Sequence, residues 1–279
     1  MVSLLGVCLL LFVAVGLSSN RAAIRLRTVL LAFGLQGGIG FVALWTDWGI
    51  AALAAASEYV AALLGYSRAG MEFMFGGLVG TSDSLGFVFA FNVLPVVIFF
   101  SSLIAVLYHA RVMQWMIRIL GGGLRKLLGT SHTESLSAAA NVFVGQAEAP
   151  LVARPYISSM TQSELFAVMV GGMASIAGSV MAGYVALGVP LEYLLAASFM
   201  AAPGGLLMAK LIEPEVDQPA EPAQGEKLAT EQYVNFIDAA ATGAMNGLQM
   251  AGAIGAMLLA FIALIAMVNG ILAASGTWL

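Results

Sequence analysis

Charged residues are scarce in this sequence. They make up 9% of its 279 residues, whereas 61% are hydrophobic, and the mean hydropathy is +0.96. A soluble domain of this length has no core large enough for so much apolar surface, so a lipid environment explains the composition better. Two stretches without any charged residue, 87–108 and 239–279, are long enough to cross a bilayer.

Residues that carry metal or nucleophilic chemistry are also few. The single cysteine, Cys8, can form no intrachain disulfide, and His109 and His132 have no ligand partner at helical spacing. The segment 80–84 does not resemble a nucleophile elbow, so we expect no enzyme and no cofactor. A net charge of −4 without a basic, aromatic-rich cluster excludes nucleic acid as a partner.

The apolar runs predict an all-α, polytopic membrane protein with about six transmembrane helices. These are expected near 3–19, 28–46, 87–109, 162–188, 193–211 and 251–273. A secretory signal is the alternative for the first run, but Arg21, Arg25 and Arg27 follow that run, as they do in a retained first helix.

Basic residues predict the topology. They lie on two loops, which the positive-inside rule places in the cytoplasm: Arg21, Arg25 and Arg27 on one, and Arg111, Arg118, Arg125 and Lys126 on the other. The chain is then a multi-pass protein of the inner membrane with its N-terminus outside.

Three segments between these spans are less apolar. Residues 51–79 and 111–128 mix charged with large apolar side chains, which indicates helices lying in the outer and inner interfaces, although ordinary solvated connectors are the alternative. Residues 213–232 are acidic and contain several prolines, which indicates a flexible loop.

The segment 131–159 combines polar and apolar residues in a way that a single span would not tolerate. A capping box, Ser131-His132-Thr133-Glu134, predicts a helix that runs to Asn141 and breaks near Gly145, and Pro150 suits the first turn of a returning helix. Two half-length helices would form a re-entrant hairpin whose polar tip lines a cavity. A cytoplasmic loop with a surface helix is the alternative.

Side chains at the hairpin tip match the needs of a nucleobase edge. Gln146 offers a donor and an acceptor, and Glu148 offers a carboxylate, for which pairing with Arg154 is the alternative role. The next helix opens with a second capping box, 161–164, and carries small residues at four-residue spacing, Gly171, Ser175, Ser179 and Gly183. These residues favour close packing, and the two serines could also face a small cation.

Several motifs resemble the concentrative nucleoside transporter family. They are Gly145-Gln146-Ala147-Glu148-Ala149-Pro150-Leu151, Arg154-Pro155-Tyr156, Met160-Thr161-Gln162-Ser163-Glu164-Leu165, Phe91-Asn92-Val93-Leu94-Pro95, Phe99-Phe100-Ser101-Ser102-Leu103, Ala202-Pro203, Lys210-Leu211 and Pro214-Glu215. The resemblance extends over nearly all of the chain. It implies a homotrimer that imports nucleosides with Na+ or H+ by alternating access, using two re-entrant hairpins in an inverted repeat.

The resemblance also implies site residues. Those facing the nucleobase would be Gly145, Gln146, Ala147, Glu148 and Val180. Those of the cation site would be Asn141, Val144, Ser175, Ile176 and Ser179. Ala147 replaces a threonine common in the motif, and Ile176 stands where a sodium-coupled member can carry a hydroxyl. Proton coupling through a buried Glu148 therefore stays open.

The resemblance divides the chain into four regions and implies that more should follow Leu279. The regions are N-terminal helices (1–110), a transport half-site (111–211), an acidic cytoplasmic loop (212–233), and an interfacial and long transmembrane helix (234–279). The family continues with a second hairpin and two helices that bind the ribose, so we expect a truncated chain. The alternative function is a nucleoside-recognition or gating module that does not transport.

Overall fold

The computed structural model describes residues 2–82, 86–145, 149, 153–176, 178–186, 188–219 and 233–276. Its helices are α1 (Val2–Gly16), α2 (Leu26–Trp45), α3 (Asp47–Phe75), α4 (Phe89–Asn92), α5 (Leu94–His109), α6 (Val112–Leu128), α7 (His132–Ala140), α9 (Gln162–Ala174), α10 (Gly178–Ala186), α11 (Leu191–Ile212) and α12 (Phe236–Gly276). Short 3-10 helices cover Arg21–Ala23, Gly76–Leu78 and Arg154–Ser159, and β1 (Thr81–Ser82) pairs with β2 (Gly86–Phe87) in an antiparallel hairpin. The predicted all-α membrane fold is confirmed.

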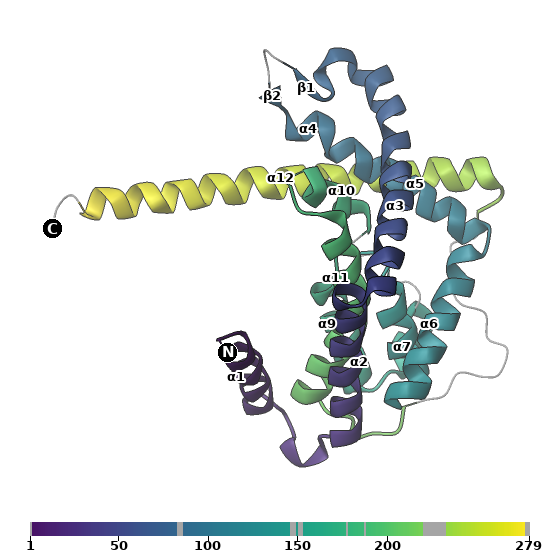
Figure 1. Ribbon diagram of the computed structural model, residues 1–279, viewed down its shortest axis with the longest axis vertical. Helices are drawn as coiled ribbons and strands as arrows, with labels where there is room; N and C mark the ends of the chain where they lie inside the picture. Colours follow the sequence, from purple (N-terminus) through teal and green to yellow (C-terminus); the bar gives the residue numbers. More distant parts are fainter. Residues whose placement is uncertain are drawn as a thin grey trace.

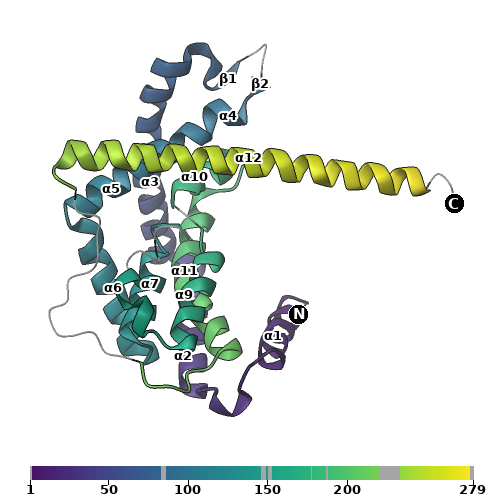
Figure 2. The same ribbon diagram turned by 180° about the vertical axis from the view of Figure 1, so that it is seen from behind.

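Two helix layers cross in this fold. In the first, α2, α6, α7, α9 and α11 pack along one direction; in the second, α12 lies across them beside α5 (Figure 1). The far half of α12 extends away from the other described helices in both views (Figures 1 and 2). The helical pair formed by α7 and α9 lies inside the first layer, against α11 and α6.

Glycines allow α12 to lie directly against α5. A Cβ added at Gly243 would come 2.8 Å from the Ser101 carbonyl oxygen, and one added at Gly247 would come 2.7 Å from the Ile98 Cα. The two glycines are four residues apart and therefore occupy one helix face. Their missing side chains let the two backbones approach, and Ser102 Oγ adds a hydrogen bond to the Ala240 carbonyl at 2.9 Å.

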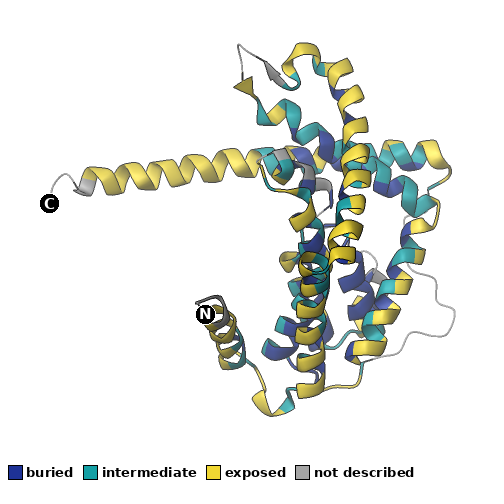
Figure 3. Ribbon diagram, viewed as in Figure 1, coloured by how far each residue is buried: buried dark blue, intermediate teal, exposed yellow. Residues whose placement is uncertain are grey.

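Large apolar side chains remain exposed over much of the surface. Buried positions gather on α5, α6, α7, α9 and α11, whereas α1, α3 and the far half of α12 are mostly exposed (Figure 3). By length and composition, five described helical stretches could cross a membrane: Leu26–Trp45, Asp47–Leu78, Phe89–His109, Leu191–Ile212 and Phe236–Ala274. Exposed apolar surface on such helices fits contact with lipid.

Three predicted helices differ from those observed. The expected span 162–188 is two helices, because the backbone of Ser175 and Ile176 is not helical. The stretch 51–79, expected as an interfacial helix, belongs mostly to α3, which is also long and apolar enough to cross a bilayer. The last helix begins fifteen residues before the predicted 251, at Phe236.

The amphipathic pattern of 111–128 correctly predicted a helix, α6. Met113, Ile117 and Leu128 are buried on its inner face, while Trp115 on the outer face is 65% exposed. A Cβ at Gly121 would come 3.2 Å from the Ser135 carbonyl oxygen, so the two helices are in close contact there. Through this contact α6 supports α7, which leads to the candidate site.

Candidate functional site

The first capping box forms as predicted and starts α7. Ser131 Oγ accepts a hydrogen bond from the Glu134 backbone N–H at 3.3 Å, and the Ser131 N–H donates to Glu134 Oε1 at 2.6 Å. These two bonds satisfy backbone donors at the helix start. The helix ends at Asn141 after nine residues, and the backbone is not helical from there to Gly145. The predicted break near Gly145 is therefore present.

The second capping box starts α9 in the same way. Thr161 Oγ1 accepts from the Glu164 N–H at 3.1 Å, and the Thr161 N–H donates to Glu164 Oε2 at 2.9 Å. This helix ends at Ser175, whose backbone is extended, and α10 begins at Gly178. The chain thus has a second helix break, at Ser175 and Ile176.

The two breaks lie against each other. Ser175 Oγ donates to Asn141 Oδ1 at 3.4 Å, which joins the ends of α7 and α9. A Cβ at Gly178 would come 2.5 Å from the Phe143 carbonyl oxygen, and one at Gly171 would come 3.0 Å from Asn141 Nδ2. Small residues are required at these positions because the two broken segments touch through backbone and amide groups.

The structure brings together part of the predicted site. Asn141, Val144 and Gly145 are buried at the end of α7; Ser175, Ile176 and Val180 are half-buried at the second break and in the first turn of α10. Ser179 lies on α10, but its side chain is not among the described ones. Gln146, Ala147, Glu148 and Pro150, with the side chain of Arg154, also lie outside the described residues. The assigned nucleobase contacts therefore stay a prediction.

The described polar groups where the breaks meet include three oxygen atoms, Asn141 Oδ1, Ser175 Oγ and the Phe143 carbonyl oxygen. Hard cations prefer such oxygen ligands, whereas transition metals favour imidazole and thiolate groups. Among the described residues, no cluster of three or more His, Cys, Asp or Glu could hold a metal. The amide nitrogen of buried Asn141 has no hydrogen-bond partner in the described part of the chain, whereas its oxygen already faces Ser175 Oγ at the junction of the two breaks.

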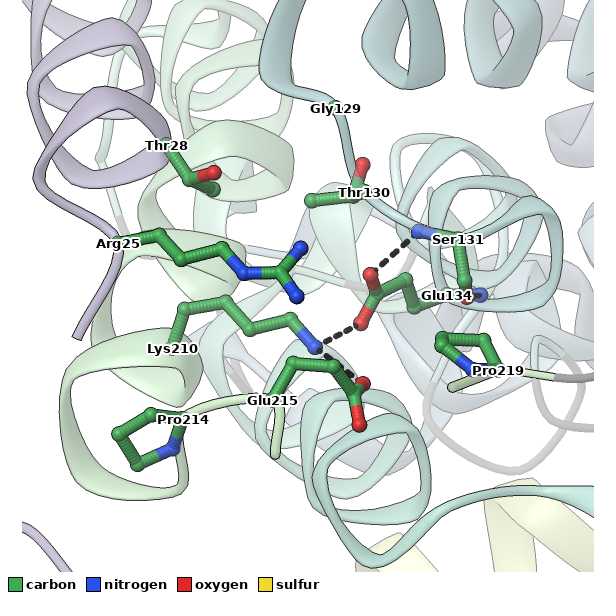
Figure 4. Close-up of a pocket in the computed structure, with 10 residues that line it drawn as sticks. All are labelled: Arg25, Thr28, Gly129, Thr130, Ser131, Glu134, Lys210, Pro214, Glu215 and Pro219. Atoms are coloured by element: carbon green, nitrogen blue, oxygen red, sulfur yellow. Dashed lines mark hydrogen bonds and ion pairs between the residues drawn. The ribbon is translucent and has the colours of Figure 1, made fainter. Parts of the chain in front are cut away.

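Sequence reasoning missed a buried ionic cluster at the opposite ends of α7 and α9. Lys210 Nζ on α11 lies 2.6 Å from Glu134 Oε2 and 3.2 Å from Glu215 Oε2 (Figure 4), and it donates to Ser163 Oγ at 2.8 Å. Glu215 was expected in a flexible acidic loop, but it is buried, because it pairs with Lys210 and accepts from Thr161 Oγ1 at 3.1 Å. A lysine within an apolar helix was the available signal, since such a charge requires a buried partner.

A small cavity of about 40 Å³ opens beside this cluster, with room for one or a few water molecules. It is lined by Arg25, Thr28, Gly129, Thr130, Ser131, Glu134, Lys210, Pro214, Glu215 and Pro219 (Figure 4). Burial raises the pKa of Glu134 above its ordinary value near 4.5, while the Lys210 ammonium acts in the opposite direction. The cavity lies at the start of α7, and the first break lies at the other end of this helix, so the cavity is separate from the candidate cation site.

Three family models together match nearly the whole chain. The Na+ dependent nucleoside transporter N-terminus matches residues 5–78, Nucleoside recognition matches 90–191, and the Na+ dependent nucleoside transporter C-terminus matches 193–279. An uncharacterized transporter of Haemophilus influenzae is 55% identical over 99% of the chain, and the nucleoside permease NupC of Helicobacter pylori is 47% identical over 96%. The chain belongs to the concentrative nucleoside transporter family.

A solved structure of this family has the same fold. CNTnw in an inward-facing substrate-bound state superposes with a TM-score of 0.93 at 54% identity and covers 99% of the chain. The chain spans 66% of the Haemophilus influenzae relative, 64% of the Helicobacter pylori permease and 66% of CNTnw. Members of the concentrative nucleoside transporter family are transporters, so the chain is not an enzyme.

Proposed function

We propose that this chain holds the nucleobase side of a nucleoside site together with a coupling-cation site, in a secondary transporter that imports nucleosides by alternating access. The observation that carries the proposal is the contact between the two helix breaks, where Asn141 and Ser175 bring side-chain oxygens within 3.4 Å. Broken helices expose backbone groups at membrane depth, and such groups serve transporters as solute and ion ligands. Gly145 ends the first break, and residues 146–148 follow it directly in the sequence.

Sodium is the coupling ion that this geometry supports best. Asn141 and Ser175 supply neutral oxygens, and backbone carbonyls at Val144 and Ile176 lie in the same two breaks. Neutral oxygens bind a hard cation but do not take up a proton near neutral pH. Proton coupling would instead require a titrating carboxyl such as Glu148.

The arrangement of basic residues supports the proposed orientation in the membrane. Thr28 Oγ1 donates to the Leu128 carbonyl at 3.0 Å, so the start of α2 lies beside the end of α6. This contact places Arg25 and Arg27 at the same end of the molecule as Lys126. Basic residues gathered at one end mark the cytoplasmic side of an inner-membrane protein, with the N-terminus outside.

Uptake into proteoliposomes tests the proposal. The intact protein from its own gene is reconstituted, and radiolabelled uridine and adenosine are offered under a sodium gradient or a proton gradient alone. We expect a sodium gradient to drive accumulation of at least one nucleoside, and Ser175→Ala to raise the sodium concentration needed. Accumulation driven equally by protons without sodium would contradict the assigned cation.

A recognition or gating module is the second candidate. The match of residues 90–191 to a model described as Nucleoside recognition favours it, because these residues include both breaks. Saturable nucleoside binding without accumulation under any gradient would establish this function instead.

A further inference from the structure

Lys210 is a buried cation far from the helix breaks. Its side chain is only 8% exposed although it lies on a helix long enough to span a bilayer. The ammonium group forms ion pairs with Glu134 on α7 and Glu215 just after α11 (Figure 4), and it donates a hydrogen bond to Ser163 on α9. One charge therefore connects three segments of the chain.

Two of these segments lead to the candidate cation site. Glu134 stands seven residues before Asn141, and Ser163 stands twelve residues before Ser175. At 1.5 Å per residue, the connecting helices are about 10 Å and about 18 Å long. They run in the same direction, since each starts near Lys210 and ends at the Ser175–Asn141 hydrogen bond. The pair is thus held at both ends.

We propose that Lys210 is a positioning residue for the cation site. By holding the starts of α7 and α9 in one register, it sets how Asn141 and Ser175 face each other at the ends of these helices. This role rests on the proposed function, because it presumes that a cation binds between the breaks. Lys210 touches neither the cation nor the nucleoside.

The chemistry of the cluster explains how Lys210 keeps this register. Any slide of α7 along α9 separates the ammonium from Glu134 or from Ser163, and a buried charge that loses its partners carries a large desolvation cost. Because the length of a helix is nearly constant, fixing the starts of α7 and α9 also fixes the positions of their ends. An apolar side chain of similar length would fill the same space without directing either helix.

Replacing the charges tests this role without leaving one unpaired. The triple variant Lys210→Met, Glu134→Gln, Glu215→Gln removes all three charges together, and Ser163→Ala removes only the link to α9. Lys126→Met, at an exposed position on α6, is the control. Each intact protein is purified in detergent, and binding of radiolabelled uridine and adenosine is titrated with sodium alongside thermal melting.

We expect the triple variant to melt as a folded protein and to bind as much nucleoside at saturating sodium, but to need at least threefold more sodium for half-maximal binding. Ser163→Ala should shift the sodium requirement in the same direction by less, and Lys126→Met should not shift it. A lowered melting temperature with an unchanged sodium requirement in both cluster variants would overturn the positioning role. Wild-type nucleoside binding that does not depend on the sodium concentration would overturn the proposed sodium coupling, and with it the positioning role of Lys210.

Discussion

The contact between the two helix breaks predicts that Gly178 tolerates no side chain. In a Gly178→Ala variant the new Cβ would lie 2.5 Å from the Phe143 carbonyl oxygen, whereas ordinary contacts begin at 3.4 Å, so the segments must separate by about 0.9 Å. The opposing group is backbone and cannot swing aside as a flexible side chain can. The whole break after α7 has to move.

Overpacking of this kind costs about 1–3 kcal/mol. The strain is relieved when the two breaks move apart, and binding requires them to come together again. The same 1–3 kcal/mol is then lost from sodium-dependent nucleoside binding, which weakens by roughly 5- to 150-fold. The measurement is a sodium titration of radiolabelled uridine and adenosine binding by the intact protein in detergent, with melting temperature recorded on the same samples.

Gly65→Ala is the matched control. Gly65 lies within α3, and a Cβ there meets nothing within 4 Å, so alanine should leave binding unchanged. Wild-type nucleoside affinity, sodium requirement and melting temperature in Gly178→Ala would refute the close contact between the two breaks. A loss of stability with unchanged binding would refute the link between this contact and the site.

Two further predictions concern the ends of α7. Gly171→Ala places a Cβ 3.0 Å from Asn141 Nδ2, so the amide must turn or shift. We expect this variant to need more sodium for nucleoside binding and to lose less stability than Gly178→Ala. An unchanged sodium requirement would contradict this prediction. Glu134→Gln removes a carboxyl group that faces Lys210, Glu215 and Arg25. Burial raises the pKa of this carboxyl group. A carboxyl group whose pKa is higher in the folded state than in the unfolded state stabilises the fold when it is protonated. This contribution is complete below about pH 4.5, and it is lost as the pH rises through the pKa of the folded state. The melting temperature of the wild type relative to Glu134→Gln should therefore fall as pH rises from about 4.5, and a constant difference would contradict this.

Local sequence signals predicted the starts of the site-bearing helices. Both capping boxes form, because a hydroxyl residue followed three positions later by glutamate satisfies the first backbone donors wherever the helix lies in the fold. The break after Asn141 was predicted from glycine and proline together, since neither favours continued helix. These signals need no knowledge of distant neighbours.

The second break and the ionic cluster depended on distant neighbours. Residues 165–188 contain no charged residue and no proline, so the sequence did not predict that the helix ends at Ser175, where Asn141 of another segment meets it. Lys210 and Glu134 are 76 positions apart in the chain, and Glu215 precedes a stretch whose composition is that of a loop. Pairing at such separations follows from tertiary packing, which periodicity does not report.

The most direct test of a cation site between the two breaks is the sodium dependence of nucleoside binding in Asn141→Leu. Leucine has nearly the shape of asparagine but no oxygen, and Asn269→Leu, at an exposed position on α12, is the matched control. Calorimetry on the intact protein should show sodium-dependent binding of uridine or adenosine in the wild type and in the control, and a loss of the sodium dependence in Asn141→Leu. Binding by Asn141→Leu with the wild-type sodium dependence would contradict the site.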